Sequence, residues 1–287
     1  MPIHRVDLSP ADYVHVPHAP RIARRVILAR GDGNPWQMRG VLGVSADGVP
    51  VGLSFHTWSH VDAPFHRLAD GATFDRLPPA QYLVSRTRVV DLTRSTASDA
   101  RVGSDARVGA ARREQMQGVD YHSVIDEADL PAALDDVEAI LFVTGFGALI
   151  DRGYPMSAGA DAHYPSLTAG AAARLAALPA LKLVAMDSPT VDKPPADGVA
   201  HVTLLGRRPS PILIVETLTC ERLRRVADPL PADGVLTIEP VRAFGPEPDG
   251  ALASVYFYYP SSAGDRPAFD AWATAMQTAV LITDAPR

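Results

Sequence analysis

Residues 56–66 read HTWSHVDAPFH and place three histidines and one aspartate within eleven positions. From residue 51 to residue 61 the odd positions are mostly apolar or β-branched, an alternation that indicates a strand with one buried face. On such a strand His56, His60 and Asp62 point to the opposite side. A helix would also bring the two histidines to one face, but the proline and the β-branched residues disfavour it. Either conformation gathers three ligand-type side chains.

The spacing of these side chains tests whether they could share one ion. Along a strand, the Cα atoms of His60 and Asp62 are about 6.6 Å apart, whereas those of His56 and His60 are about 13 Å apart. A shared ion therefore requires a bend between the two histidines. His66 follows the proline and is close enough to be a ligand or a proton shuttle. The alternative is that some of the nine histidines cluster by chance and play structural roles.

The chemistry of these groups and the bulk composition limit the cofactor and the partners. Imidazole and carboxylate ligands suit Zn²⁺ and also allow Mn²⁺. A single cysteine, Cys220, excludes a thiolate cluster, so nitrogen and oxygen must hold any metal. The net charge of −6 gives no reason to expect a nucleic-acid partner. Because no run of about 18 apolar residues or signal-peptide core occurs, we expect a soluble, cytoplasmic protein without a membrane partner.

Apolar runs bounded by Gly, Pro, Asp or Ser predict the strands. They cover 87–92, 138–145, 181–187, 211–218, 234–241 and 252–259. Apolar residues at three- and four-residue steps predict helices over 166–178, with Ser166 as N-cap, and over 267–282. Together with 26 prolines, this pattern favours one α/β domain over residues 1–287 with long connections rather than a regular barrel. The duplicated SDARVG at 98–109 is interpreted as a surface insertion.

The motif at 56–66 resembles the hallmark of the metal-dependent cyclase family, which includes bacterial kynurenine formamidases and isatin hydrolases. Further matches follow in the family's order and extend the resemblance over about residues 5–220, leaving 221–287 as a C-terminal extension. They are VDLS at 6–9, FVTGF at 142–146, YPSLTAGAAARLAAL at 164–178, LVAMDSPTVD at 183–192, HVTLL at 201–205 and ILIVETL at 212–218. The resemblance implies a swivelling β/β/α fold, with a mixed sheet core and flanking helices, and a homo-oligomer, either dimer or tetramer.

The resemblance also implies roles for individual residues. His56, His60 and Asp62 would hold one divalent ion, with Asp62 bridging to a second ion held by His201 and Glu216. The implied content is one or two ions per chain, with Zn²⁺ first and Mn²⁺ second. The implied proton donor and acceptor is His66. The chain departs from the family pattern at position 58, where a tryptophan replaces glycine, and at 206–211, where GRRPSP lengthens the step to the glutamate.

Two further groups of residues are candidates around the metal. Four aromatic residues are expected to wall the substrate pocket, with core packing as the alternative for the phenylalanines: Trp58, Phe65, Phe74 and Phe146. Three polar residues are expected to support the ligands from behind, with capping of strand ends as the alternative: Asp187, Ser188 and Asp192.

The expected function is hydrolysis of an amide, formamide, lactam or lactone bond in a small aromatic or cyclic substrate. The attacking group would be a water activated by the divalent ion. Two alternatives remain open: a metal-dependent cyclase or dehydratase of polyketide-like secondary metabolism, and a metal-binding protein without catalysis. The second is favoured if the ring of Trp58 blocks the pocket.

Overall fold

We describe the protein from a computed structural model, which covers residues 2–9, 41–44, 50–52, 56, 58–94, 112–152, 163–193, 197–240 and 248–283. Within these ranges eight strands form one mixed sheet in the order β1-β14-β13-β5-β9-β11-β12-β4. Their bounds are β1 Ile3–Asp7, β4 His60–Asp62, β5 Val84–Asp91, β9 Ala139–Val143, β11 Leu183–Met186, β12 Leu213–Glu216, β13 Asp233–Pro240 and β14 Gly250–Pro260. β4 also pairs with β14, and this pairing closes the sheet on itself.

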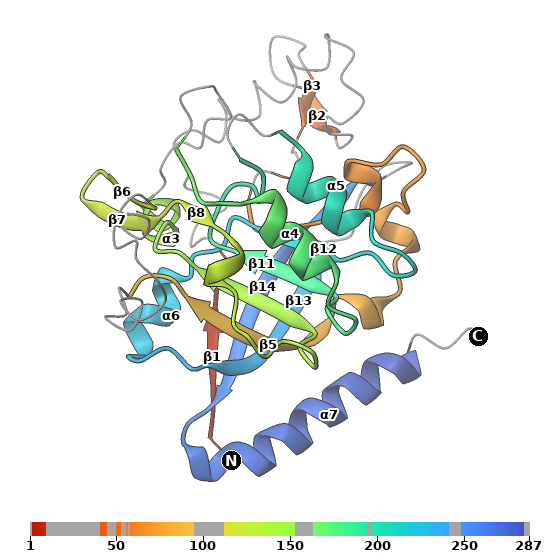
Figure 1. Cartoon of the computed structure of the whole chain (residues 1–287). Coiled ribbons are helices and arrows are strands. Elements are labelled where there is room, and N and C mark those ends of the chain that lie inside the picture. The colour runs from red at the N-terminus through yellow and green to blue at the C-terminus, as the bar shows by residue number, and fades with distance from the viewer. Residues whose placement is uncertain are drawn as a thin grey trace.

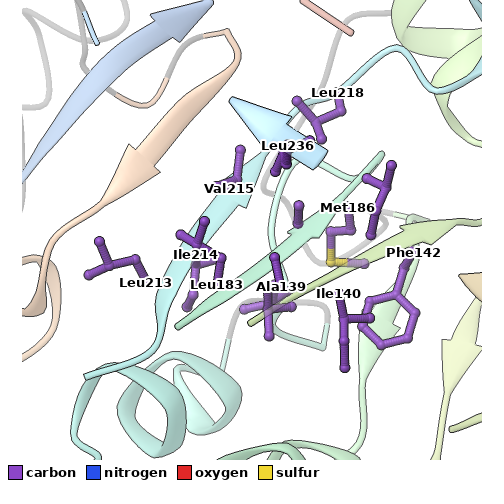
Figure 2. Packing of buried hydrophobic residues seen from close by; sticks show 14 of the residues in the cluster. Ala139, Ile140, Phe142, Leu183, Met186, Leu213, Ile214, Val215, Leu218 and Leu236 are labelled. Carbon is purple, nitrogen blue, oxygen red and sulfur yellow. The ribbon is translucent and has the colours of Figure 1, made fainter. Parts of the chain in front are cut away.

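The four strands β5, β9, β11 and β12 are parallel, and the other pairs of the sheet are antiparallel. β9, β11 and β12 are buried along their whole length, and their sequences AILFV, LVAM and LIVE are almost entirely apolar. Parallel strands covered on both faces show such continuous apolar runs. Figure 2 shows their side chains packed together in the core, with Leu236 of β13 beside them.

Helices flank this sheet. They are α3 Gly147–Asp151, α4 Ala169–Ala176, α5 Val199–Leu205, α6 Glu221–Val226 and α7 Arg266–Thr283, with 3₁₀ turns η2 Pro64–His66, η3 Phe74–Arg76, η4 Pro79–Gln81, η6 Glu127–Asp129 and η7 Ala263–Asp265. α4 and α5 contact each other, whereas α7 lies against β5 and β14, away from them (Figure 1). Short pairs join β2 Val41–Val44 with β3 Pro50–Gly52, β6 Arg113–Met116 with β7 Val119–His122, and β8 Val124–Ile125 with β10 Ser166–Leu167.

The structure confirms the α/β fold with a mixed sheet core and flanking helices, and each of the six predicted strands and both predicted helices. The start of the helix predicted over 166–178 is wrong, because α4 begins at Ala169. Thr168 is its N-cap and its hydroxyl accepts a hydrogen bond from the Ala171 N–H. Ser166 instead lies in β10, where its N–H donates to the carbonyl of Ser123. The duplication at 98–109 lies outside the described residues.

The continuous strand predicted over 51–62 is also wrong. β3 ends at Gly52, His56 lies in a turn, Trp58 and Ser59 are bends, and β4 begins at His60. This interruption is the bend that a shared ion requires. It brings the His56 and His60 ring centroids to 4.9 Å from each other.

The residues expected to form a C-terminal extension contribute two strands to the main sheet. β13 lies between β5 and β14, and β14 pairs with β13, β1 and β4. Among the described residues, no helix is both long enough and apolar enough to cross a membrane.

Candidate metal centre

The candidate ligands come from two neighbouring strands, one helix and the turn at His56. His60 and Asp62 are the first and last residues of β4, which pairs with β12 so that His60 lies opposite Glu216. Opposite residues of an antiparallel pair project to the same face. α5 carries His201, whose backbone N–H donates to the carboxylate of Asp192. His201 and Glu216 are thus brought beside His60 and Asp62, which lie 139 to 156 positions earlier in the sequence.

The carboxylate of Asp62 lies between three imidazoles. Its Oδ1 is 2.7 Å from Nδ1 of His56 and 3.3 Å from Nε2 of His60. Its Oδ2 is 3.1 Å from Nε2 of His201. The two oxygens therefore face two different groups of nitrogen atoms, which is the arrangement that a bridging carboxylate needs.

Glu216 lies between two of the same imidazoles. Its Oε2 is 3.4 Å from Nε2 of His60, and its Oε1 is 3.4 Å from Nε2 of His201. The backbone N–H of Val191 donates to Oε1 and holds the side chain in place. The inserted loop at 206–211 does not displace Glu216, because its residues 208–210 are exposed on the outside.

Each of the three imidazoles also has its second nitrogen next to an oxygen. Nδ1 of His60 donates to the carbonyl of Trp58 at 2.5 Å, and Nδ1 of His201 donates to Asp192 at 2.7 Å. Nε2 of His56 lies 3.2 Å from Oδ2 of an aspartate outside the predicted set, Asp249. Metal-binding histidines usually have such an oxygen at the nitrogen that does not bind the ion, because it fixes the tautomer and the ring orientation.

His66 lies on the outer side of the centre. Its ring centroid is 4.1 Å from that of His56 and 5.4 Å from that of His201, and its Nδ1 is 3.4 Å from Asp249. The side chains of His56, His66 and Asp249 are between 11% and 17% exposed, whereas those of His60, Asp62, His201 and Glu216 are at most 4% exposed. Solvent therefore reaches the centre from the side of His66.

The buried carboxylates favour positive charge in this space. Burial lowers the pKa of each imidazole, but the neighbouring carboxylates outweigh it. The pKa of His60 rises to about 10 beside Asp62 and Glu216, and that of His201 rises to about 10 beside Glu216 and Asp192. Burial raises the pKa of Asp62, but the imidazoles around it hold the pKa well below its ordinary value.

The two outer imidazoles, those of His56 and His66, have pKa values shifted in opposite directions. Burial lowers the pKa of His56, but Asp249 and Asp62 raise it to about 9. The pKa of His66 falls to about 4 because of burial and because His56 carries positive charge beside it. His56 and His66 do not both become charged, because burial and the positive charge on His56 disfavour a second positive charge on His66.

These observations test whether the residues fit a divalent ion. Nε2 of His60 and Oδ1 of Asp62 are buried, and within the described ranges neither makes a hydrogen bond. Nitrogen and oxygen atoms of His56, His60 and Asp62 all lie within 4.8 Å of one another, and so do those of Asp62, His66 and His201. Such a donor set, buried and rich in carboxylate, fits Zn²⁺ or Mn²⁺.

The predicted aromatic wall is only partly near this centre. Trp58 is buried next to the ligands and its carbonyl accepts from His60, while Phe65 is half-buried in η2 beside His66. Phe74 packs in the main core against Tyr82. Phe146 packs against Tyr121 in a separate apolar cluster. The placement of these two phenylalanines favours the core-packing alternative, and the substrate-binding role of the four stays a prediction.

Of the three supporting residues, one contacts a candidate ligand directly. Asp192 accepts from the ring of His201 and from the first turn of α5. Asp187 instead accepts four hydrogen bonds from the segment 144–147 that follows β9. The hydroxyl of Ser188 donates to the carbonyls of Pro165 and Thr190. Asp187 and Ser188 therefore hold the loops behind the centre.

Sequence reasoning missed Asp249. This residue follows the predicted ligand His56 by 193 positions and has no histidine or acidic ligand motif around it. The signal that could have found it is a single acidic residue directly before a long apolar run, since the end of a strand is a common place for a site residue.

A hollow of about 160 Å³ lies elsewhere, between β5, β13 and the start of α7. Five of its six charged residues pair with one another: Arg88 with Asp233, and Arg86 and Arg266 with Asp270. None of the candidate metal ligands lines this hollow.

Comparison with known proteins gives a family and a fold. Residues 12–193 match the family described as "Putative cyclase", and no curated protein matches the chain. A solved structure described as a potential metal-dependent hydrolase with cyclase activity is 18% identical, with 91% of this chain and 100% of that chain covered and a TM-score of 0.54.

Two other similar structures are isatin hydrolases A. The one from Ralstonia solanacearum is 15% identical, with 90% of this chain and 92% of that chain covered and a TM-score of 0.54. The one from Labrenzia aggregata, bound to benzyl benzoate, is 17% identical, with 89% and 93% covered and a TM-score of 0.52. At these identities the likeness establishes the fold and not the activity.

Proposed function

Because the chain belongs to the cyclase family, which it matches over residues 12–193, we propose that it is a metal-dependent hydrolase. The proposed substrate is a small aromatic or cyclic compound with an amide, formamide, lactam or lactone carbonyl. One observation carries the proposal. The carboxylates of Asp62 and Glu216 each lie between Nε2 of His60 and Nε2 of His201 in a buried space.

The residues that would hold the metal are those that the geometry brings together. We propose His56, His60 and Asp62 for one ion, and Asp62, His201 and Glu216 for a second. A bound divalent ion supplies Lewis acidity and lowers the pKa of a coordinated water to about 7. We name Zn²⁺ first and Mn²⁺ second because imidazole nitrogen and carboxylate oxygen suit both.

The side chains of the chain orient the reactants and move protons. Asp192 and the carbonyl of Trp58 fix the rings of His201 and His60, so their inward nitrogens need no reorganisation. His66 is the proposed proton carrier, since it lies at the solvent side and its Nδ1 faces Asp249. Its Nε2 is then the nitrogen that accepts the proton of water and passes it to the leaving nitrogen or oxygen.

The choice of a C–N bond rests on the relatives. Three of the similar solved structures are isatin hydrolases, and a cyclic amide is therefore our first choice of substrate. The family description and the metal-dependent hydrolase with cyclase activity support the alternative of a cyclase. The two reactions differ in mass balance, because hydrolysis adds one water to the substrate and cyclisation does not.

The test begins with protein stripped of metal by a chelator. It is assayed against isatin, an N-formyl aniline and an aromatic lactone, before and after addition of Zn²⁺ or Mn²⁺, and products are weighed by mass spectrometry. We expect activity only with metal. The ring-opened products of isatin and of the lactone should each be one water heavier than the substrate, and the N-formyl aniline should be split into the aniline and formate, which together contain the added water. The variant Asp62→Asn should lose the metal, while Asp120→Asn, on the exposed side of β7, should behave as the wild type.

Three results would contradict the proposal. Full activity in metal-free protein would exclude the metal role. Products of unchanged mass, or with one water lost, would favour the cyclase or dehydratase. A metal-loaded protein inert toward all three substrates would favour a metal-binding protein without catalysis.

We also propose a homo-oligomer, dimer or tetramer, which light scattering on the eluting protein would test.

A further inference from the structure

Asp249 is held against the centre through its backbone. It lies directly before β14, and its carbonyl accepts from the N–H of Ala63, the residue that follows Asp62. The carbonyl of the preceding Pro248 accepts from the N–H of Phe74. Two hydrogen bonds to separate parts of the chain thus fix the position from which the Asp249 side chain extends.

One oxygen of Asp249 lies next to two imidazoles with different proposed roles. Oδ2 is 3.2 Å from Nε2 of His56, a proposed metal ligand, and 3.4 Å from Nδ1 of His66, the proposed proton carrier. The two ring centroids are 4.1 Å apart and the rings are tilted by 34°. A single carboxylate therefore touches the ligand set and the proton carrier together.

Each of the two ring nitrogens of His56 faces a carboxylate. Nδ1 is 2.7 Å from Oδ1 of Asp62, and Nε2 faces Asp249. An imidazole can present either nitrogen to an ion, and an acceptor at one nitrogen decides which one remains for the metal. His201 repeats the arrangement with Asp192 in place of Asp249.

We propose that Asp249 is a positioning residue that directs Nδ1 of His56 to the metal and Nε2 of His66 to the substrate. The proposal rests on the proposed function, because it assigns a role within the same centre. It links the acid–base group to the ligand shell, so that the orientation of one ring depends on the orientation of the other.

The competing role for Asp249 is that of a direct metal ligand, since its oxygen and the nitrogens of His56 and His66 lie within 4.8 Å of one another. We favour positioning because Nε2 of His56 points away from the Asp62 side, where the proposed ligands of both ions converge. An ion held by Asp249 would be a further ion and would have to take the proton carrier as a ligand.

The experiment compares wild-type protein with Asp249→Asn, Asp249→Ala and Asp233→Asn. Asp233 is the matched control because it lies in the same C-terminal region, in an ion pair with Arg88 away from the histidines. Zn²⁺ is used as the probe because it is diamagnetic. Affinity is measured by competition with a chromophoric chelator, ions per chain by elemental analysis, and ring protonation by ¹⁵N spectra of histidine-labelled protein.

We expect the affinity for Zn²⁺ to fall by about 100-fold in Asp249→Ala and by about 10-fold in Asp249→Asn, whose carbonyl oxygen still accepts from one ring. At saturating Zn²⁺ the number of ions per chain should not change. In the spectrum of the zinc-loaded wild type, His56 should be protonated at Nε2 alone. Asp249→Ala should lose this single tautomer, and Asp233→Asn should match the wild type.

Unchanged affinity and unchanged histidine signals in both Asp249 variants would overturn the proposal. A loss of one ion per chain at saturating Zn²⁺ would also overturn it, because Asp249 would then be a ligand. Thermal unfolding of the metal-free proteins separates these outcomes from misfolding, and Asp249→Asn has nearly the shape of the wild-type residue. If the wild type binds no divalent ion, the proposed function fails as well; if it does, only the role of Asp249 is in question.

Discussion

The imidazole of His56 occupies the space in which a side chain at Gly250 would lie. A Cβ atom at position 250 would be 2.9 Å from Cε1 of His56 and 2.7 Å from the carbonyl oxygen of Val61. Gly250 lies opposite Asp62 in the β14–β4 pair. The missing side chain therefore lets the His56 ring lie beside Asp62, where its Nδ1 reaches the carboxylate.

Gly250→Ala is expected to weaken metal binding and to destabilise the fold. The methyl group must displace either the His56 ring or the backbone of β4, and overpacking of this kind costs about 1 to 3 kcal/mol. Metal titration and urea unfolding measure the two effects. The matched control is Gly264→Ala in η7, whose added Cβ would meet only Ser262 Oγ at an ordinary 3.7 Å. Equal metal affinity in both variants would contradict this account of Gly250.

Thr217 directly follows Glu216 and has a φ of 62°, in the left-handed region that β-branched residues avoid. At ordinary positions alanine is more stable than glycine, because glycine loses more conformational freedom on folding. Here we expect the reverse: Thr217→Gly should be more stable than Thr217→Ala by about 1 kcal/mol. Denaturant unfolding of the two variants measures the difference, and a more stable alanine variant would argue against strain at this position.

Asp187→Asn is expected to lower the free energy of unfolding by about 3 kcal/mol. Four donors point at this buried carboxylate: the N–H and hydroxyl of Thr144 at one oxygen, and the N–H groups of Gly145 and Gly147 at the other. In asparagine an NH₂ group replaces one of these two oxygens, and its N–H groups would face the donors that the oxygen accepted from. Chemical unfolding compares this variant with Asp135→Asn, which removes an exposed carboxylate. A loss no larger than that of Asp135→Asn would show that the four contacts contribute little.

Six of the strands could be predicted from the sequence because each is a short apolar run between residues that end strands. The runs at 138–145, 181–187 and 211–218 became β9, β11 and β12, which are buried on both faces. The closure of the sheet could not be predicted in this way. It depends on three residues, 60–62, that pair with both β12 and β14, and a periodicity within 11 residues contains no information about a partner 190 positions away.

The residues of the metal centre also differ in whether the sequence could predict them. His56, His60, Asp62 and His66 are local in sequence, so their residue types alone predicted a cluster. His201 and Glu216 came from the family resemblance, and the structure places His201 beside both Asp62 and Glu216. Asp249 came from neither, because a lone aspartate before a strand has many structural uses. Its nearness to His56 follows from the β4–β14 pairing, which the sequence pattern does not encode.

We expect the protein to lose stability in acid as the carboxylate of Glu138 becomes protonated. Burial raises the pKa of Glu138, but hydrogen bonds from Lys182 and from the Arg86 backbone outweigh it and hold the pKa below its ordinary value. A carboxylate whose pKa is lower in the folded state stabilises the fold above its unfolded pKa, near 4.5, and this contribution is lost as the pH falls through the lower folded pKa. Glu138→Gln should therefore be less stable at pH 7 by about 1 to 2 kcal/mol.

Unfolding free energies of the wild type and Glu138→Gln, measured from pH 7 to pH 3, check this sign. The difference between the two proteins should be constant above about pH 5 and should shrink below it. Glu239→Gln, which removes an exposed carboxylate from β13, is the control and should follow the wild type at every pH. A Glu138→Gln deficit that grows in acid would mean that the pKa is raised and not lowered.

Truncation tests whether residues 233–287 are part of the fold or an appendage. Removing them deletes β13 and β14, breaks the pairs with β5, β1 and β4, and removes Asp249 from the centre. We expect the protein that lacks residues 233–287 to show no cooperative unfolding and to bind no metal. Removing only 266–287 deletes α7, which covers Val84 and Val235 with Phe269 and Ala273, and leaves the closed sheet intact. That chain should unfold cooperatively with lower stability, since burying a large apolar side chain contributes about 2 to 3 kcal/mol, and should keep its affinity for Zn²⁺. Circular dichroism melts and metal titration distinguish the two truncated proteins. If the protein that lacks residues 233–287 still folds and binds metal, the sheet does not need β14 to close.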